Sequence, residues 1–213
     1  VAWGDNVSGQ LDVPGGLTNL VAIAAGYTHN LALRSDGTVT AWGYNGYGEC
    51  DVPAELSNVV AIAAGGFHNL ALRSDGTVAA WLNNDYGQCN VPEGLADVVA
   101  VSAGGSHSLA LRSDGTITAW GGAWAGQCDV PAGLADVTAI AAGGEHNLAL
   151  KSDVTVVMLG GEGYGIGVPA DLSDVIAIAA GYGHSLALRS DGTVTAWGIN
   201  YCGQSDVPEG LTD

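Results

Sequence analysis

Two residue types recur along this chain at one fixed interval. The histidines are separated by 39, 39, 39 and 38 residues, and the prolines keep the same interval. The positions are His29, His68, His107, His146 and His184, with Pro14, Pro53, Pro92, Pro131, Pro169 and Pro208. This period predicts a series of similar units that stack, because one unit of this size cannot bury its apolar residues alone.

Each unit reads as short strands rather than helices, because its apolar residues alternate along the chain. Leu31 and Leu33 share one face of a strand, and a second strand starts near Val39. The Asp36-Gly37 pair between them predicts a hairpin turn at positive φ. Three or four short strands fit in each unit.

A unit of about 40 residues with four strands has the size of a β-propeller blade. We therefore predict an all-β protein, a β-propeller of about five four-stranded blades in a single domain over residues 1–213. The half-repeat 1–20 precedes the repeats 21–58, 59–97, 98–136, 137–174 and 175–213. The Ala/Gly-rich strand of each repeat should lie near the axis, and its tryptophan strand should pack between neighbouring blades.

One stretch of the repeat is nearly the same in every copy. In the third copy it runs from Ala103 to Thr116 as Ala-Gly-Gly-Ser-His-Ser-Leu-Ala-Leu-Arg-Ser-Asp-Gly-Thr, and Trp-Gly and Gly-Gln pairs follow in most copies. This sequence resembles the repeat of the regulator of chromosome condensation family, which implies a β-propeller. The founding member is a guanine-nucleotide exchange factor and chromatin binder, but the short bacterial-type repeats most similar to this chain share no common activity.

The charge balance excludes several classes of partner. The chain has 5 Lys+Arg against 22 Asp+Glu, a formal net charge of −17. Nucleic-acid binding needs cations that displace counterions, and this chain cannot supply them. No apolar run approaches the roughly 18 residues of a membrane span, and no signal peptide is visible. With a single methionine and few lysines, the acidity favours an extracellular or cell-surface location. The chain starts with Val1, so we expect a processed chain or a piece of a longer one.

The two halves of the repeat occur in unequal numbers. The half with the histidine occurs five times, and the half that runs from Trp-Gly to Val-Pro occurs six times. The surplus half could pad a closed ring, mark a window on a longer array, or complete a blade in a neighbouring subunit by strand addition. Head-to-tail contacts build filaments unless their rotation closes a ring. The residues expected at such an interface are Val1, Ala2, Trp3, Gly4, Leu11, Val13, Trp197, Cys202 and Val207.

No residue pattern indicates catalysis, a metal site or a cofactor. The histidines recur once per blade, about 72° apart around the axis, so they cannot converge on one ion with its short ligand distances. We expect each imidazole to satisfy backbone groups instead. Serines beside the histidines follow the repeat, whereas an enzyme site normally breaks symmetry. The five histidines and the tryptophans of the repeat are therefore assigned structural roles; these tryptophans are Trp42, Trp81 and Trp120.

The cysteines divide into two kinds. Cys50, Cys89 and Cys128 share one repeat position, where the first half-repeat has Leu11, and this exchange indicates a small apolar pocket. Cys202 lies in a different loop, where an exposed thiol could crosslink subunits.

Charged residues recur around the hairpin turns and links. Basic residues precede the turn aspartates by two positions, which predicts an Arg–Asp ladder; the pairs are Arg34–Asp36, Arg73–Asp75, Arg112–Asp114, Lys151–Asp153 and Arg189–Asp191. Further acidic residues in Asp-Val-Pro and in the links indicate a solubilising surface, with weak Ca²⁺ bridging as an alternative. In the fourth copy, Val154 replaces the turn glycine, and since valine is unfavourable at positive φ we expect a different turn there.

These observations favour a non-catalytic structural or interaction scaffold that self-assembles head-to-tail through its terminal half-repeats. Its partners would be other copies of itself or another protein. The alternative is a multivalent lectin-like propeller whose loops stack on and hydrogen-bond glycans. The loops concerned are Tyr44–Tyr47, Asn83–Tyr86 and Asn200–Tyr201.

Overall fold

The computed structural model describes residues 2–161 and 166–211, and it contains five antiparallel sheets of three strands each. The strands are β1 (Leu20–Ala25), β2 (His29–Arg34), β3 (Val39–Gly43), β4 (Val59–Ala64), β5 (His68–Arg73), β6 (Val78–Leu82), β7 (Val98–Ala103), β8 (His107–Arg112), β9 (Ile117–Gly121), β10 (Val137–Ala142), β11 (His146–Lys151), β12 (Val156–Gly160), β13 (Val175–Ala180), β14 (His184–Arg189) and β15 (Val194–Gly198). The described residues include no helix that could cross a membrane. The predictions of an all-β fold and of five repeated units are confirmed.

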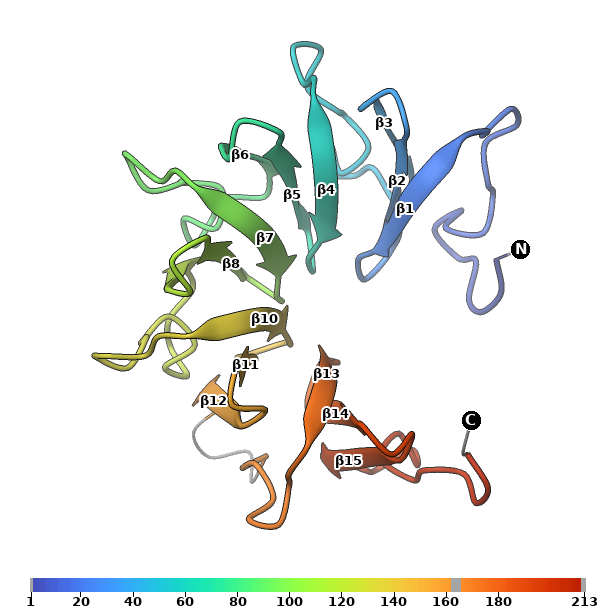
Figure 1. The fold of residues 1–213 in the computed structure, drawn as a ribbon. Coiled ribbons are helices and arrows are strands. Elements are labelled where there is room, and N and C mark those ends of the chain that lie inside the picture. The colour runs from blue at the N-terminus through green and yellow to red at the C-terminus, as the bar shows by residue number, and fades with distance from the viewer. Residues whose placement is uncertain (1, 162–165, 212–213) are drawn as a thin grey trace.

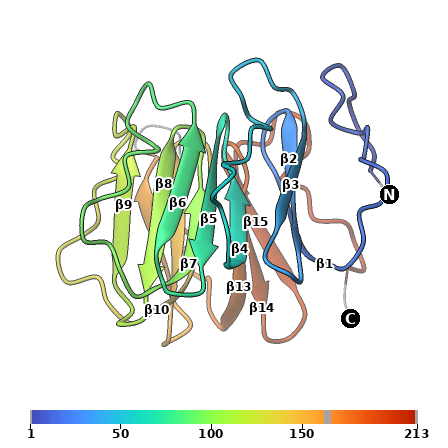
Figure 2. The same cartoon turned by 90° about the horizontal axis from the view of Figure 1, so that it is seen from above.

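The five sheets follow one another around a common axis in chain order, and the N- and C-terminal segments lie in the sector between the first sheet and the fifth (Figure 1). Seen from above, the strands of neighbouring sheets stand side by side with loops at both ends (Figure 2). In each sheet the middle strand pairs with both others, as β2 does with β1 and β3. The repeat therefore produces one three-stranded meander per copy.

Each sheet has three strands where we predicted four, because the segment after the third strand folds into turns. In the first repeat, Asp51 N–H donates to Gly48 O and Val52 N–H donates to Cys50 O. These short-range bonds occupy the backbone groups that a fourth strand would offer to a neighbour. The proline that follows has no N–H and does not support a strand ladder.

The hairpin turns form as predicted at the Asp-Gly pairs. Gly37 has φ +79°, its N–H donates to Arg34 O, and Arg34 N–H donates to Thr38 O. Only the glycine has positive φ, so the loop is a three-residue hairpin with a left-handed last residue rather than a two-residue turn.

The core lies between successive sheets. Leu31 and Leu33 of β2 are buried against Trp81 of the second sheet, and Ile62 of β4 packs against the same cluster. Equivalent clusters join the second sheet to the third, the third to the fourth and the fourth to the fifth. The tryptophan strand thus packs between sheets, as predicted.

The first strand of each sheet runs toward the axis (Figure 1). The last residue of each of these strands and the glycine turn that follows it line a pocket of ≈ 210 Å³. Glycine permits the close approach, since a Cβ at Gly65 would lie 2.5 Å from Gly104 O. Gly66 N–H also donates to Gly104 O at 3.0 Å, which ties the second turn to the third.

Candidate interaction surfaces

The histidines connect each sheet to the next. His29 Nε2 lies 2.7 Å from Asn69 Oδ1, and His107 Nε2 lies 2.6 Å from Asn147 Oδ1. Serine takes the asparagine's place elsewhere, with His68 Nε2 3.0 Å from Ser108 Oγ. The partner is therefore a side chain 40 residues away rather than the backbone group that we predicted.

Burial keeps these imidazoles neutral. It lowers the pKa of His68 to about 3, with His107 and His29 adding to the effect, and it lowers the pKa of His146 to about 4. A neutral imidazole suits an inter-sheet hydrogen bond that is shielded from water. No group of three or more metal-ligating side chains occurs among the described residues.

The asparagine or serine completes the link by donating to the preceding loop. Asn69 Nδ2 donates to Glu49 O at 3.0 Å, and Asn147 Nδ2 donates to Gln127 O at 2.7 Å. The first half-repeat makes the same contact, because Asn30 Nδ2 donates to Gln10 O at 2.8 Å. The first half-repeat therefore packs on the first sheet just as other loops pack on theirs.

One face of the first sheet points away from the second sheet. In the other sheets the equivalent face is covered by the preceding sheet, but among the described residues no sheet precedes this one. Ile23 of β1 is 76% exposed, whereas the equivalent Ile62 is half-buried against the preceding sheet. A groove of ≈ 760 Å³ runs along this face between β1 and the first half-repeat, and Trp3, Leu11 and Val13 line it.

The opposite face of the fifth sheet is open too. Ala177 and Ala179 of β13 are exposed, whereas Ala61 and Ala63 are half-buried beneath the following sheet. His184 is only half-buried, in contrast to the four preceding histidines. These two surfaces, named here the first end face and the last end face, are the two halves of an interface that the molecule contains four times.

The residues expected at the interface lie in several places. Ala2, Trp3, Leu11 and Val13 line the groove of the first end face. Gly4 lies beside them at φ +119°. On the C-terminal side, Cys202 and Val207 are exposed. Trp197 is buried against the fourth sheet and belongs to the core, and Val1 lies outside the described residues.

The repeated cysteines hold their loops through the thiol, which goes beyond the apolar pocket that we predicted. Cys50, Cys89 and Cys128 Sγ donate to loop carbonyls at 3.4, 3.3 and 3.2 Å, and Ser205 Oγ makes the equivalent bond at 3.1 Å. Burial raises the pKa of Cys89 to about 11, so its thiol stays a donor. All four cysteines are unbridged, and Cys202 is exposed as expected.

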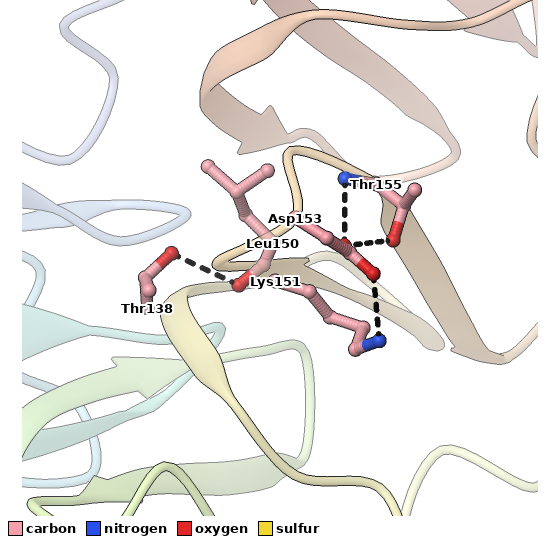
Figure 3. A network of polar contacts seen from close by, with 5 residues as sticks. All are labelled: Thr138, Leu150, Lys151, Asp153 and Thr155. Atoms are coloured by element: carbon pink, nitrogen blue, oxygen red, sulfur yellow. Dashed lines mark hydrogen bonds and ion pairs between the residues drawn. The ribbon is translucent and has the colours of Figure 1, made fainter.

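The predicted Arg–Asp ladder is wrong as a general feature. Asp36 accepts from Thr38 N–H at 3.0 Å and from Thr38 Oγ1–H at 2.7 Å, because a short aspartate side chain caps its own turn. Among the described residues, the ion pair that forms is Lys151–Asp153, at 3.1 Å (Figure 3). These aspartates stabilise the hairpins locally.

The altered fourth hairpin keeps the turn geometry of the others, contrary to our prediction. Val154 has φ +63°, and its N–H donates to Lys151 O at 3.0 Å, as Gly37 N–H does to Arg34 O. Asp153 still accepts from Thr155, and Lys151 pairs with it (Figure 3). The surrounding sheet therefore imposes a left-handed conformation on a β-branched residue.

The predicted glycan loops use their amides internally. Asn45 Nδ2 donates to Asp51 Oδ1, and Asn45 Oδ1 accepts from Cys50 N–H. Asn84 Oδ1 accepts from Cys89 N–H in the same way. Their aromatic rings are left as the groups that a ligand could reach.

Sequence reasoning missed an aromatic group at the axis. Tyr27, Phe67 and Tyr182 come from glycine turns of three different sheets, and their rings meet with Tyr47 and Tyr44 in one continuous series. The signal was present in the sequence, because these are positions where the repeat varies.

Three solved structures that share this fold are of longer chains. Prp20p of Saccharomyces cerevisiae matches with a TM-score of 0.72 and 23% identity, over 89% of this chain and 59% of its own. Human WBSCR16 matches with a TM-score of 0.73 and 22% identity, over 85% and 63%. The ectodomain of the Arabidopsis thaliana receptor kinase ACR4 matches with a TM-score of 0.79 and 20% identity, over 99% and 77%. The chain thus spans about three fifths of Prp20p and WBSCR16, and these matches show a shared fold.

The sequence comparisons identify the repeat. Among curated proteins, no sequence matches this chain. The family model of the regulator of chromosome condensation (RCC1) repeat matches residues 20–49, 59–88, 98–123 and 175–204, which together make up more than half of the chain. On these matches, the chain belongs to the RCC1-repeat family.

Proposed function

We propose that this protein is a non-catalytic interaction scaffold whose copies associate head-to-tail through their end faces. The observation that carries the proposal is the equivalence of these faces to the inner interfaces. Between the sheets, an isoleucine or valine of one first strand packs against the Leu-x-Leu strand of the preceding sheet. The first end face exposes Ile23, and the last end face carries Leu186 and Leu188. Ile23 of one copy can therefore pack on the two leucines of another copy.

Polar groups complement each other across the same faces. His184 is the counterpart of His29, which bonds to an asparagine of the next sheet. Asn30 is the counterpart of that asparagine in the first sheet, and its Nδ2 already donates to Gln10 O. A second copy would therefore bring Asn30 Oδ1 to His184 Nε2. Docking also requires the contact between Tyr27 and Tyr182 at the axis to open.

Relatives of this fold support a role in protein binding. The structure of Prp20p was described together with its binding to Gsp1p and histones. Yeast RCC1 was also solved bound to Kap60. The end faces of this chain are the surfaces where we place its own protein contacts.

Two variants, each with a charged residue introduced on one end face, test the proposal. Their size is measured by light scattering over a range of concentrations. We expect concentration-dependent growth for the unaltered chain, and monomers for both Ile23→Glu and Ala179→Lys. An equimolar mixture of the two variants should give dimers and nothing larger, because only one intact face of each kind remains. Val60→Lys is the matched control, since Val60 is 54% exposed on β4 and lies on neither end face.

The equimolar mixture distinguishes head-to-tail association from a symmetric interface between two copies. A symmetric interface would give no dimer that is specific to the mixture. If the unaltered chain stays monomeric at all concentrations, self-assembly is wrong. Binding of neutral glycans by that monomer would then support the lectin-like alternative.

A further inference from the structure

Within the otherwise regular stretch around each histidine, the two residues before the histidine vary from copy to copy. These pairs are Tyr27-Thr28, Gly66-Phe67, Gly105-Ser106, Gly144-Glu145 and Tyr182-Gly183. The turns that hold them converge on the axis. A Cβ at Gly66 would collide with Gly105 O, and one at Gly144 would collide with Tyr182 O, so the middle sheets need glycine there. The first and fifth sheets carry tyrosine at the same position, as Tyr27 and Tyr182.

Aromatic side chains gather there in an aromatic array, which comprises Tyr27, Tyr44, Tyr47, Phe67 and Tyr182. The ring centroids of Tyr27 and Phe67 lie 5.6 Å apart, and those of Tyr27 and Tyr182 lie 5.9 Å apart. Tyr47 joins Phe67 at 6.0 Å, and Tyr44 joins Tyr47 at 6.0 Å. The Tyr27 and Tyr182 rings are tilted by 57°, whereas the other three contacts are edge-to-face, an arrangement that aromatic pairs favour.

The array is accessible, and Tyr27 and Tyr182 line the axial pocket. Tyr27 is 47% exposed and Tyr182 is 66% exposed. A Cβ at Gly66 would lie 3.1 Å from the Tyr27 ring, and one at Gly105 would lie 3.0 Å from the Tyr27 hydroxyl. The ring of Tyr27 therefore extends over the turns of the second and third sheets.

A carboxylate stands beside the array. Glu145 acts electrostatically on Tyr27, whose pKa rises to about 12 mainly through burial and then through Tyr182 and Glu145. Glu145 also lines a small pocket with Tyr182. Its Oε1 accepts from Trp124 Nε1–H at 2.8 Å, and Trp124 stacks edge-on with Tyr86 at 4.9 Å. The carboxylate is thus held between two groups of aromatic rings.

The basic residues of the chain are all at the opposite end of the sheets. They are Arg34, Arg73, Arg112, Lys151 and Arg189, each at the far end of a strand that starts at a histidine. The aromatic end therefore carries no cation of its own, in a chain of net charge −17. Aromatic faces next to a carboxylate attract organic cations, and guanidinium stacks on such faces better than ammonium does.

We propose that the aromatic array and Glu145 bind an arginine-containing segment of a partner protein. The proposed site belongs to a single copy, in which Tyr27 and Tyr182 are in contact. Head-to-tail association opens that contact and would compete with arginine binding, so binding is measured at concentrations where the chain is monomeric. An arginine guanidinium would stack on Tyr27 and Tyr182 and pair with Glu145.

Titration with a capped hexa-arginine peptide at 150 mM salt, where long-range attraction is screened, tests the proposal. We expect the double variant Tyr27→Gly/Tyr182→Gly to bind about tenfold more weakly, although its charge is unchanged. Glycine occupies these positions in the other three sheets, so the variant should fold. Tyr201→Gly is the control, because Tyr201 is 92% exposed and makes no ring contact among the described residues.

The contribution of the Glu145 carboxylate is measured by comparing two variants that each remove one negative charge. We expect Glu145→Gln to weaken binding severalfold more than Glu209→Gln, which removes an exposed carboxylate from the C-terminal segment. Equal affinities of the double tyrosine variant and the unaltered chain would overturn the proposal, since only diffuse attraction would then remain. Cellohexaose binding that is lost in the same variant would overturn it too, by assigning the array to sugars.

Discussion

At the residue scale, the departures from the repeat are as informative as the repeat itself. Val154 adopts φ +63°, where the other hairpins have glycine. Glu49 is fully buried at a position where most other copies have glutamine, and its Oε1 has no partner. Both residues keep the shape of the repeat at a local cost in free energy, so restoring the common residue should stabilise the protein.

Val154→Gly should raise the free energy of unfolding by about 1 kcal/mol. Relief of the left-handed valine contributes about 1–2 kcal/mol, and the added freedom of glycine in the unfolded chain offsets part of it. Thermal unfolding should show a rise in Tm of roughly 2–4 °C. Gly115→Val, the reverse change in another hairpin, is the control and should lower Tm. An unchanged Tm in both would contradict the strain argument.

Glu49→Gln should also stabilise the protein, by about 1 kcal/mol, because it removes a buried negative charge. The gain stays small, since the amide nitrogen of the equivalent Gln127 has no partner either. The bond from Tyr47 N–H to the side chain, 3.0 Å long, can be kept by the amide oxygen. Chemical denaturation at pH 7 gives the comparison. Gln127→Glu, at the equivalent buried position, should destabilise; a stabilising effect there would refute this explanation.

At the element scale, each sheet is joined to the next by a polar link inside an apolar interface. Asn147 uses both ends of its amide: Oδ1 pairs with His107 Nε2, and Nδ2 donates to Gln127 O. Ser108 makes both contacts in the preceding interface with a single hydroxyl. The link fixes the position of each sheet against the next, since these buried groups have no access to water.

Asn147→Ala should lower the free energy of unfolding by about 2–3 kcal/mol, because it leaves a buried carbonyl and a buried imidazole nitrogen unpaired. Asn147→Ser should cost clearly less, since serine serves this position in two other sheets. Equilibrium unfolding in urea separates the two variants. Equal losses would mean that the side-chain volume matters rather than the hydrogen bonds.

At the scale of the whole molecule, stacking the repeats buries a row of histidines and leaves two end faces. Burial lowers the pKa of His29, His68, His107 and His146, so these four stay neutral in the folded protein, but the unfolded chain can protonate them below a pH of about 6.5. The folded state therefore binds fewer protons, and stability falls as the pH drops below that value. The turn aspartates act in the same direction at lower pH, because hydrogen bonds from the following threonine lower their pKa, as at Asp36.

His68→Gln should make stability less dependent on pH. Between pH 7.5 and pH 5 the unaltered protein should lose about 2 kcal/mol more than the variant, because His68 stays neutral when folded and is protonated when unfolded. Urea unfolding at both pH values measures the difference. Parallel losses in the two proteins would show that His68 is not responsible for the acid sensitivity.

The sequence alone determined the length of the repeat, the short strands and the hairpins, because these depend on residues close together in the chain. Alternation in Leu31–Leu33 and the Asp36-Gly37 pair specify a strand and its turn without help from distant residues. It also indicated correctly that Trp81, Trp120 and Trp197 pack between units and that Cys202 is exposed.

Only the tertiary structure decided which distant residues meet. His29 finds Asn69 at a separation of 40 residues, and Tyr27 meets Tyr182 because the sheets curve around an axis. It also decided that Val154 follows its neighbours into a left-handed turn, although the local preference of valine predicted a different turn. Contacts between stacked units depend on their relative rotation, and no single repeat encodes that rotation.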